Sequence, residues 1–147
     1  MIANIKAAVF YGIILYVIIF IAVSIMLFTP GLKSILWLRW MIDWLVVGLG
    51  SYYFSLKYFK KTPGKIYAGA VLAFFWLSVH VVLDLIITVP LTLKSVSAQI
   101  GRQASYVDAA GVFYYEWKLW VGFIIMLVVT TIMAGNSQTT TPVQKTN

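Results

Sequence analysis

AAVFYGIILYVIIFIAVSIMLF, residues 7–28, is a run of twenty-two residues without a single charge. The triplet Thr29-Pro30-Gly31 follows it with the residues that typically end a helix and begin a turn. About 20 consecutive apolar residues are enough for a helix to cross the hydrocarbon core of a bilayer. No small-residue cleavage site of the signal-peptide kind is evident, so we expect this run to persist as a membrane-spanning helix.

The composition of the whole chain agrees with a membrane protein. Of its 147 residues, 62% are hydrophobic and only 10% are charged, whereas soluble domains are about half apolar and a quarter charged. This excludes a soluble secreted domain, a disordered chain and a coiled coil. The chain has no cysteine, which excludes disulfide exchange, thiol catalysis and thiolate metal sites.

The apolar runs predict an all-α fold, an antiparallel four-helix transmembrane bundle in one domain of residues 1–136. The expected spans cover residues 7–28, 34–59, 66–89 and 114–134. Pro90 is expected to end the third span, and residues 91–113 form the one long connection. Residues 137–147 are rich in Thr and Gln and are expected to be a disordered cytoplasmic tail.

The net charge of +7 is better explained by topology than by nucleic-acid binding. The strongest basic cluster lies between the second and third spans and consists of Lys57, Lys60, Lys61 and Lys65. Because cytoplasmic loops carry an excess of lysine and arginine, we expect this connection and both termini to be cytoplasmic. The first and third connections would then face outward, although Lys33, Lys94 and Arg102 lie there.

The connection over residues 91–113 has apolar residues at helical spacing. Val96, Ile100, Ala104 and Val107 recur every three or four residues among serines, glutamines and Arg102. This spacing is typical of an amphipathic helix on the outer membrane surface. A mobile loop is the alternative.

Three of the four acidic residues and the only histidine fall in or beside the predicted spans, with Arg39 close by. The residues of this group are Arg39, Asp43, His80, Asp84 and Glu116. A charge in the middle of a membrane costs about 2.5–3.5 kcal/mol on insertion scales, so such side chains usually face the bundle interior and are paired.

Four of these residues are expected to form two pairs, each at one depth in the membrane. If the second and third spans are antiparallel neighbours, Arg39 lies at the depth of Asp84. By the same argument, Asp43 lies at the depth of His80. Residues four apart share one face of a helix, so we predict one polar cluster near the outer membrane face. Glu116 enters the same layer from the fourth span.

Two interpretations of this cluster stay open. It is either a structural network that joins the second and third spans, or an outward-facing pocket for a polar ligand, a proton or an ion. One histidine and no cysteine argue against a structural zinc site, so we expect no metal and no cofactor. Catalysis has less support because no nucleophile-elbow or zinc-protease motif is present, although Asp43 could orient His80 as a general base.

Two stretches resemble segments of small bacterial four-span membrane proteins of unknown function. They are LDLIITVPL, residues 83–91, and WKLWVGF, residues 117–123. The resemblance implies a bacterial inner membrane and no particular activity. Four-span oxidoreductases of the vitamin K epoxide reductase type need cysteines, and small multidrug transporters carry an acid in their first span; this chain has neither.

These patterns favour a non-enzymatic membrane protein with an outward-facing polar cluster, acting in ligand binding, in sensing or as an accessory subunit. The alternatives are a small oligomeric proton-coupled transporter or channel, and a membrane enzyme that uses Asp43 and His80. The expected partners are the lipid bilayer and a second copy or a larger membrane complex, without nucleic acid.

Overall fold

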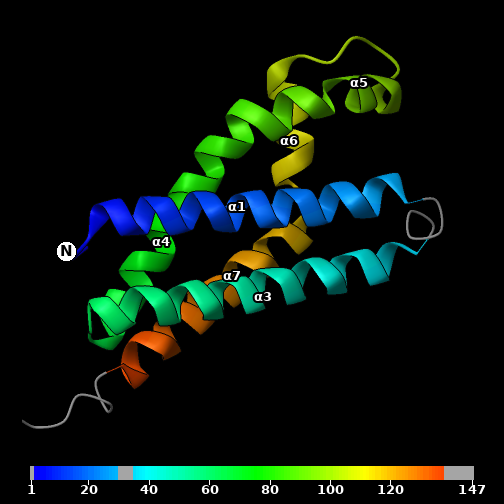
Figure 1. Ribbon diagram of the computed structural model, residues 1–147. Coiled ribbons are helices and arrows are strands. Elements are labelled where there is room, and N and C mark those ends of the chain that lie inside the picture. The colour runs from blue at the N-terminus through cyan, green and yellow to red at the C-terminus, as the bar shows by residue number, and fades with distance from the viewer. Residues whose placement is uncertain (1, 30–34, 138–147) are drawn as a thin grey trace, which may run out of the picture.

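The computed structural model describes residues 2–29 and 35–137, and the regular elements among these residues are all helices, with no strand (Figure 1). Three helical segments within these ranges are long and apolar enough to cross a membrane. They are Ile5–Met26 in α1 (Ile5–Phe28), Ile66–Ile100, and α7 (Trp117–Asn136). The structure therefore confirms a helical protein with the features of a membrane protein.

The helix α3 (Leu36–Lys61) is as long as the others but less apolar. Its 26 residues span about 39 Å, yet Arg39, Asp43 and three lysines near its end lower its hydropathy. The long Ile66–Ile100 segment consists of α4 (Ile66–Leu83), the π-helical turn η1 (Asp84–Thr88) and α5 (Val89–Ile100). The short helix α6 (Tyr106–Tyr114) then leads to α7.

The long helices pack as a ring in the order α1, α3, α7, α4. Consecutive helices α3 and α4 lie on opposite sides of this ring and do not pack extensively against each other. The prediction that they are antiparallel neighbours is therefore wrong. Helix α1 lies alongside α3, whereas α4 crosses α1 (Figure 1).

Small residues account for this choice of neighbours, because they let helix backbones approach closely. A Cβ atom at Gly69 of α4 would lie 2.5 Å from the backbone oxygen of Thr130 in α7. One at Gly50 of α3 would lie 2.5 Å from Cδ1 of the Leu15 side chain, so this glycine makes room for a side chain of α1. Close backbone approach is thus built into the α4–α7 contact, and Gly50 accommodates Leu15 in the α1–α3 contact.

Two side-chain hydrogen bonds join α1 to α4 in register. Trp76 Nε1 donates to the Ala8 carbonyl oxygen at 2.9 Å, and His80 Nε2 lies 3.3 Å from the Gly12 carbonyl oxygen. The second contact lies four residues, about one turn, after the first on both helices, which shows that α1 and α4 run in the same direction. Gly12 makes this possible, since a Cβ there would lie 2.9 Å from Trp76 Cδ1.

The helix that begins at Ile66 does not end at Pro90, contrary to the sequence prediction. Proline lacks an N–H and its ring clashes with the preceding turn of an α-helix. The π-helical turn η1 directly before it widens the helix, and the Val89 N–H bonds to the Asp84 oxygen five residues back. In this register the Leu85 carbonyl would pair with the missing Pro90 donor, and Tyr106 Oη of α6 donates to it instead.

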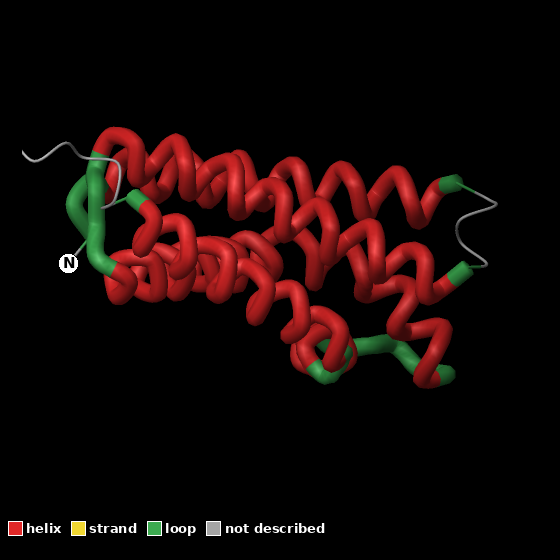
Figure 2. Tube along the Cα trace, turned by 90° about the horizontal axis from the view of Figure 1, so that it is seen from below, coloured by secondary structure: helices red, strands yellow, loops and turns green. Residues whose placement is uncertain are grey.

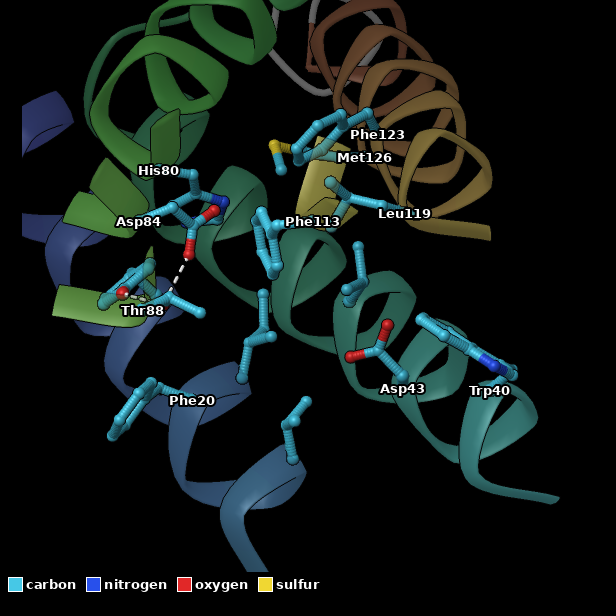
Figure 3. Close-up of a pocket in the computed structure, with 15 residues that line it drawn as sticks. Phe20, Trp40, Asp43, His80, Asp84, Thr88, Phe113, Leu119, Phe123 and Met126 are labelled. Carbon is cyan, nitrogen blue, oxygen red and sulfur yellow. Dashed lines mark hydrogen bonds between the residues drawn. The ribbon is translucent and has the colours of Figure 1, made fainter. Parts of the chain in front are cut away.

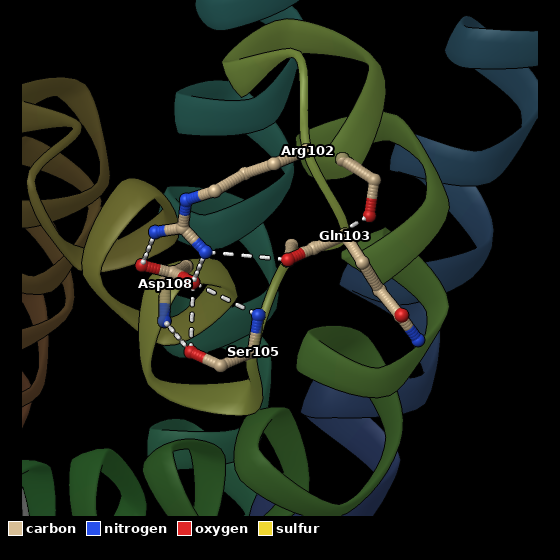
Figure 4. A network of polar contacts seen from close by, with 6 residues as sticks. Arg102, Gln103, Ser105 and Asp108 are labelled. Atoms are coloured by element: carbon tan, nitrogen blue, oxygen red, sulfur yellow. Dashed lines mark hydrogen bonds and ion pairs between the residues drawn. The ribbon is translucent and has the colours of Figure 1, made fainter.

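The connection over residues 91–113 is helical rather than a loop, but it is two helices and not one. Gly101 ends α5 in the left-handed conformation, with φ of 69°. Ser105 begins α6 in a capping box with Asp108, and Arg102 Nη1 and Nη2 each lie 3.0 Å from the Asp108 carboxylate (Figure 4). Figure 2 shows this turn set to one side of the long helices.

Two predicted features fall outside the described residues. They are the start of the second helix at Ser34 and the tail from residue 138 onward. At the edge of the described chain, Ser137 Oγ accepts a hydrogen bond from the Gly64 N–H at 3.3 Å, which joins the end of α7 to the α3–α4 connection.

Candidate functional site

A cavity of about 140 Å³ lies between the helices, in the half of the bundle that is away from the α3–α4 connection. Its lining comes from α1, α3, α4, η1, α6 and α7 and is mostly apolar. The lining residues are Tyr16, Ile19, Phe20, Val23, Trp40, Asp43, Val47, His80, Asp84, Thr88, Phe113, Leu119, Gly122, Phe123 and Met126. A cavity of similar size in another protein holds a benzene ring, so there is room for a small ligand.

Three of the five predicted site residues line this cavity. Asp43 reaches it from α3, His80 from α4 and Asp84 from the start of η1, as Figure 3 shows. The exposed fractions of these residues are 8%, 4% and 8%. Helix α3 does not pack extensively against the continuous α4–η1 segment, so Asp43 faces the other two residues across the centre of the ring and not at a helix–helix contact.

Asp84 is held by a chain of hydroxyl groups from two helices. Thr88 Oγ1 donates to Asp84 Oδ1 at 2.8 Å, so its own oxygen is left to accept from Tyr16 Oη at 2.9 Å. Thr88 lies one turn after Asp84 on the same helix, and Tyr16 comes from α1. The hydroxyl donors beside Asp84 are therefore already committed to this chain.

His80 is oriented by the backbone of α1. A carbonyl oxygen can only accept, so the 3.3 Å contact with the Gly12 carbonyl requires the hydrogen to be on Nε2. In the neutral ring, Nδ1 then carries the lone pair. The ring also packs against Tyr16, with 5.6 Å between ring centroids. His80 is thus fixed in one orientation and one tautomer.

Asp43 has the least satisfied side chain in the cavity. Its Oδ1 atom is buried and has no hydrogen-bond partner among the described residues. An unpaired carboxylate oxygen away from water is costly, so such an atom in a native structure points to a missing partner or a functional role. Trp40 Nε1 is also buried without a partner, and Figure 3 shows it on the side of the ring away from Asp43.

Arg39 and Glu116 do not line the cavity. Arg39 lies one turn before Asp43, near enough for an electrostatic attraction, but its guanidinium is placed over the Trp40 ring at 5.1 Å. Glu116 pairs with Lys118 at 3.1 Å, and Lys118 also lies over Trp40. Neither predicted pair, Arg39 with Asp84 or Asp43 with His80, forms an ion pair or hydrogen bond within the part of the chain that the structure describes.

Sequence reasoning missed the residues that support the three polar groups. Tyr16 lies in the uncharged first span and carried no signal, and Thr88 is a neutral residue among apolar neighbours. The spacing of Asp84 and Thr88, four residues apart on one face, could have indicated a hydrogen bond between them. Phe113 lies in the connection that was expected to be an outer loop.

Comparisons with protein-family models, with curated protein sequences and with solved structures found no match for this chain.

Proposed function

We propose that this chain is a four-span membrane protein that binds a small ligand in the cavity shared by Asp43, His80 and Asp84, as a sensor or an accessory subunit. The observation that carries the proposal is the convergence of these buried polar groups on one mostly apolar cavity. Ligand sites commonly combine an apolar lining with a few placed polar groups.

The outer face of α3 supports its assignment as the fourth span. Large apolar or aromatic side chains that are about half exposed recur along it every three or four residues, and they are Trp37, Met41, Leu45, Leu49, Tyr52 and Leu56. Asp43 instead faces the interior. A helix with a continuous apolar outer face and inward polar groups suits a lipid environment.

The direction of the helices agrees with four crossings. Helix α3 runs opposite to α1, since Asn4 N–H donates to Tyr58 Oη at 3.2 Å near the end of α3. With the lysine-rich α3–α4 connection in the cytoplasm, both termini are cytoplasmic and the cavity lies in the outer half. We propose the bacterial inner membrane as its location.

Two alternatives have less support. A proton path would need ionisable groups through the other half of the bundle. There Leu15, Leu72 and Trp76 fill the interior, and the fully buried polar groups of the described chain are the hydroxyls of Ser51, Ser55 and Thr130. For an enzyme, His80 would need a nucleophile or an activating carboxylate. Ser78 points away and bonds to the Phe74 oxygen at 2.9 Å.

Topology can be tested because the chain has no cysteine. Single substitutions Lys33→Cys and Lys61→Cys place a thiol before and at the end of α3. In intact cells a membrane-impermeant maleimide should label the first and not the second, which should react only after permeabilisation. Equal labelling of both would show that α3 does not cross the membrane.

Ligand binding can be tested with benzylamine, benzyl alcohol and benzoate, which share one ring and differ in charge. At least one should raise the thermal unfolding temperature of the purified protein in detergent. A ligand at 100 times its Kd stabilises by about 2.7 kcal/mol. Gly122→Leu fills the cavity and should remove the shift, whereas Gly122→Ala should keep it, since its Cβ lies 3.9 Å from the nearest atom. No shift with any probe, or an equal shift in Gly122→Leu, would refute a binding cavity.

A further inference from the structure

The formal charges of the cavity lining are all negative. The lining contains two carboxyl groups, and no lysine or arginine is among the lining residues of the described chain. Arg39, whose charge acts on Asp43, stacks on Trp40 and is not among the lining residues. Asp84 accepts from the Thr88 hydroxyl and forms no ion pair with another described residue. Removing carboxylates from water is costly unless an opposite charge offsets it.

The hydrogen-bonding groups are one-sided as well. Thr88 and Tyr16 use their hydrogens within the chain that ends on Asp84, and His80 uses Nε2 on the Gly12 oxygen. Among the described residues Asp43 Oδ1 is an acceptor without a donor, and the one unpartnered donor of the lining, Trp40 Nε1, lies on the side of its ring away from Asp43 (Figure 3). Around the two carboxyl groups the cavity thus offers acceptors to a ligand, which must supply the donors.

Aromatic faces complete the lining. Phe20, Trp40, Phe113 and Phe123 line the cavity together with Tyr16. Aromatic rings attract cations through their negative faces, and the attraction is larger where water is excluded. An apolar ring or short chain would be held by the same surfaces.

From these observations we propose that the cavity binds a small organic cation, an ammonium group carried on an apolar body of about the size of a benzene ring. The ammonium group donates to Asp43 and is attracted by Asp84, and the apolar body packs among the phenylalanines. This inference rests on the proposed function and adds the chemical class of the ligand.

An inorganic cation fits less well. Across residues 2–29 and 35–137, no three His, Asp or Glu side chains come close enough to hold one metal ion. Asp43, His80 and Asp84 therefore surround a volume and do not converge on a point. A ligand with its own bulk can occupy that volume and place one charged group at a carboxylate.

The experiment compares benzylamine, protonated at pH 7, with benzyl alcohol and benzoate, by isothermal titration of the full chain in detergent. Benzylamine should bind at least about tenfold more tightly than benzyl alcohol, because hydrogen bonds between charged groups are about twice as strong as neutral ones. Asp43→Asn should remove this preference and leave the affinity for benzyl alcohol within about twofold. Glu116→Gln is the matched control, an acid at the same end of the bundle but outside the cavity, and should change neither.

The outcomes separate the two proposals. Tighter binding of benzyl alcohol or benzoate, still lost in Gly122→Leu, would overturn the cationic ligand and leave the binding cavity standing. A preference for benzylamine that Asp43→Asn and Asp84→Asn both keep, but Glu116→Gln loses, would place the cation outside the cavity. Binding of none of the three compounds would overturn both proposals. If Asp43→Asn does not fold, Asp84→Asn provides the same comparison.

Discussion

The two halves of this bundle are built differently. Toward the α3–α4 connection the interior of the bundle is filled by Leu15, Leu72 and Trp76, which are 0–1% exposed. A separate pocket of about 350 Å³ lies at the end of the bundle, against the connection itself. Beside α5 and α6 the same helices leave a cavity of about 140 Å³. The first half has glycines and the buried hydroxyl groups of Ser51, Ser55 and Thr130, whereas the second half has buried ionisable side chains. Small residues let backbones meet, whereas carboxyl groups cannot be packed against each other cheaply.

The substitution expected to have the largest effect on this contrast replaces Gly69, in the packed half, with a larger residue. Gly69→Ala puts a Cβ 2.5 Å from the Thr130 backbone oxygen and 2.6 Å from Thr131 Cα, so α4 and α7 must separate. We expect a loss of about 3 kcal/mol in the free energy of unfolding in detergent.

The matched control for Gly69→Ala is the same substitution in the cavity half. Gly122→Ala should be neutral or gain up to about 1 kcal/mol, because alanine is the better helix former and has room there. Similar effects at both positions would contradict the contrast between the halves.

Two tryptophans provide the second test. Trp76→Phe removes the hydrogen bond to the Ala8 oxygen and leaves a small void between α1 and α4. We expect a loss of about 2 kcal/mol, measured by thermal or denaturant unfolding. Trp40→Phe, whose Nε1 has no partner in the described chain, should cost less than half as much. A larger effect at Trp40 would show that the cavity half carries more of the stability.

The hydroxyl of Tyr106 is expected to have a smaller effect, at the contact of α6 with η1. Tyr106→Phe leaves the Leu85 carbonyl without the donor that replaces the missing Pro90 N–H. We expect a loss of about 1 kcal/mol and faster hydrogen exchange in residues 84–94. In a Pro90→Ala background the backbone N–H is restored, so the same substitution should cost less. An unchanged cost in that background would mean that Tyr106 does not act through the Leu85 carbonyl.

The smallest effect is expected at the turn between α5 and α6. Hydrogen bonds from the Arg102 guanidinium and from Ser105 hold the pKa of Asp108 well below its usual range. A carboxyl group with a depressed pKa in the folded state stabilises it fully above its ordinary pKa of about 3.9 and loses this contribution as the pH falls below that value.

Hydrogen exchange of residues 101–108, corrected for intrinsic rates, should therefore be constant from neutral pH to about pH 4 and accelerate below it. Asp108→Asn should exchange faster at neutral pH and show no such dependence. Acceleration that begins above pH 5 would contradict the role of this carboxyl group.

Several features of the fold follow from sequence alone, and others do not. The helix boundaries at Phe28 and Lys61 are close to those expected, because Thr-Pro-Gly follows each run. The end of the third span at Pro90 was wrong, since the π-helical turn and a tyrosine from another helix remove the usual penalty of proline. The spacing from Val96 to Val107 predicted one helix, but Gly101 interrupts it with a positive φ.

The candidate site, like the fold, was predictable from the sequence only in part. The depth of Asp43, His80 and Asp84 along their helices was predictable from the rise per residue, and all three line the cavity. Their pairing was not, because it depended on which helices are neighbours. Arg39 and Glu116 found partners on their own helices or in the adjacent turn, and not across the bundle.

Composition and apolar run length by themselves determined that the chain is helical and suited to a membrane, because uncharged runs of that length have few other stable environments. Only the tertiary structure decided that α3 and α4 stand on opposite sides of the ring and that a cavity separates their polar residues. The physical reason is that burial and hydrogen bonding within a helix are local, whereas the choice of neighbour depends on where glycines of distant segments allow backbones to meet.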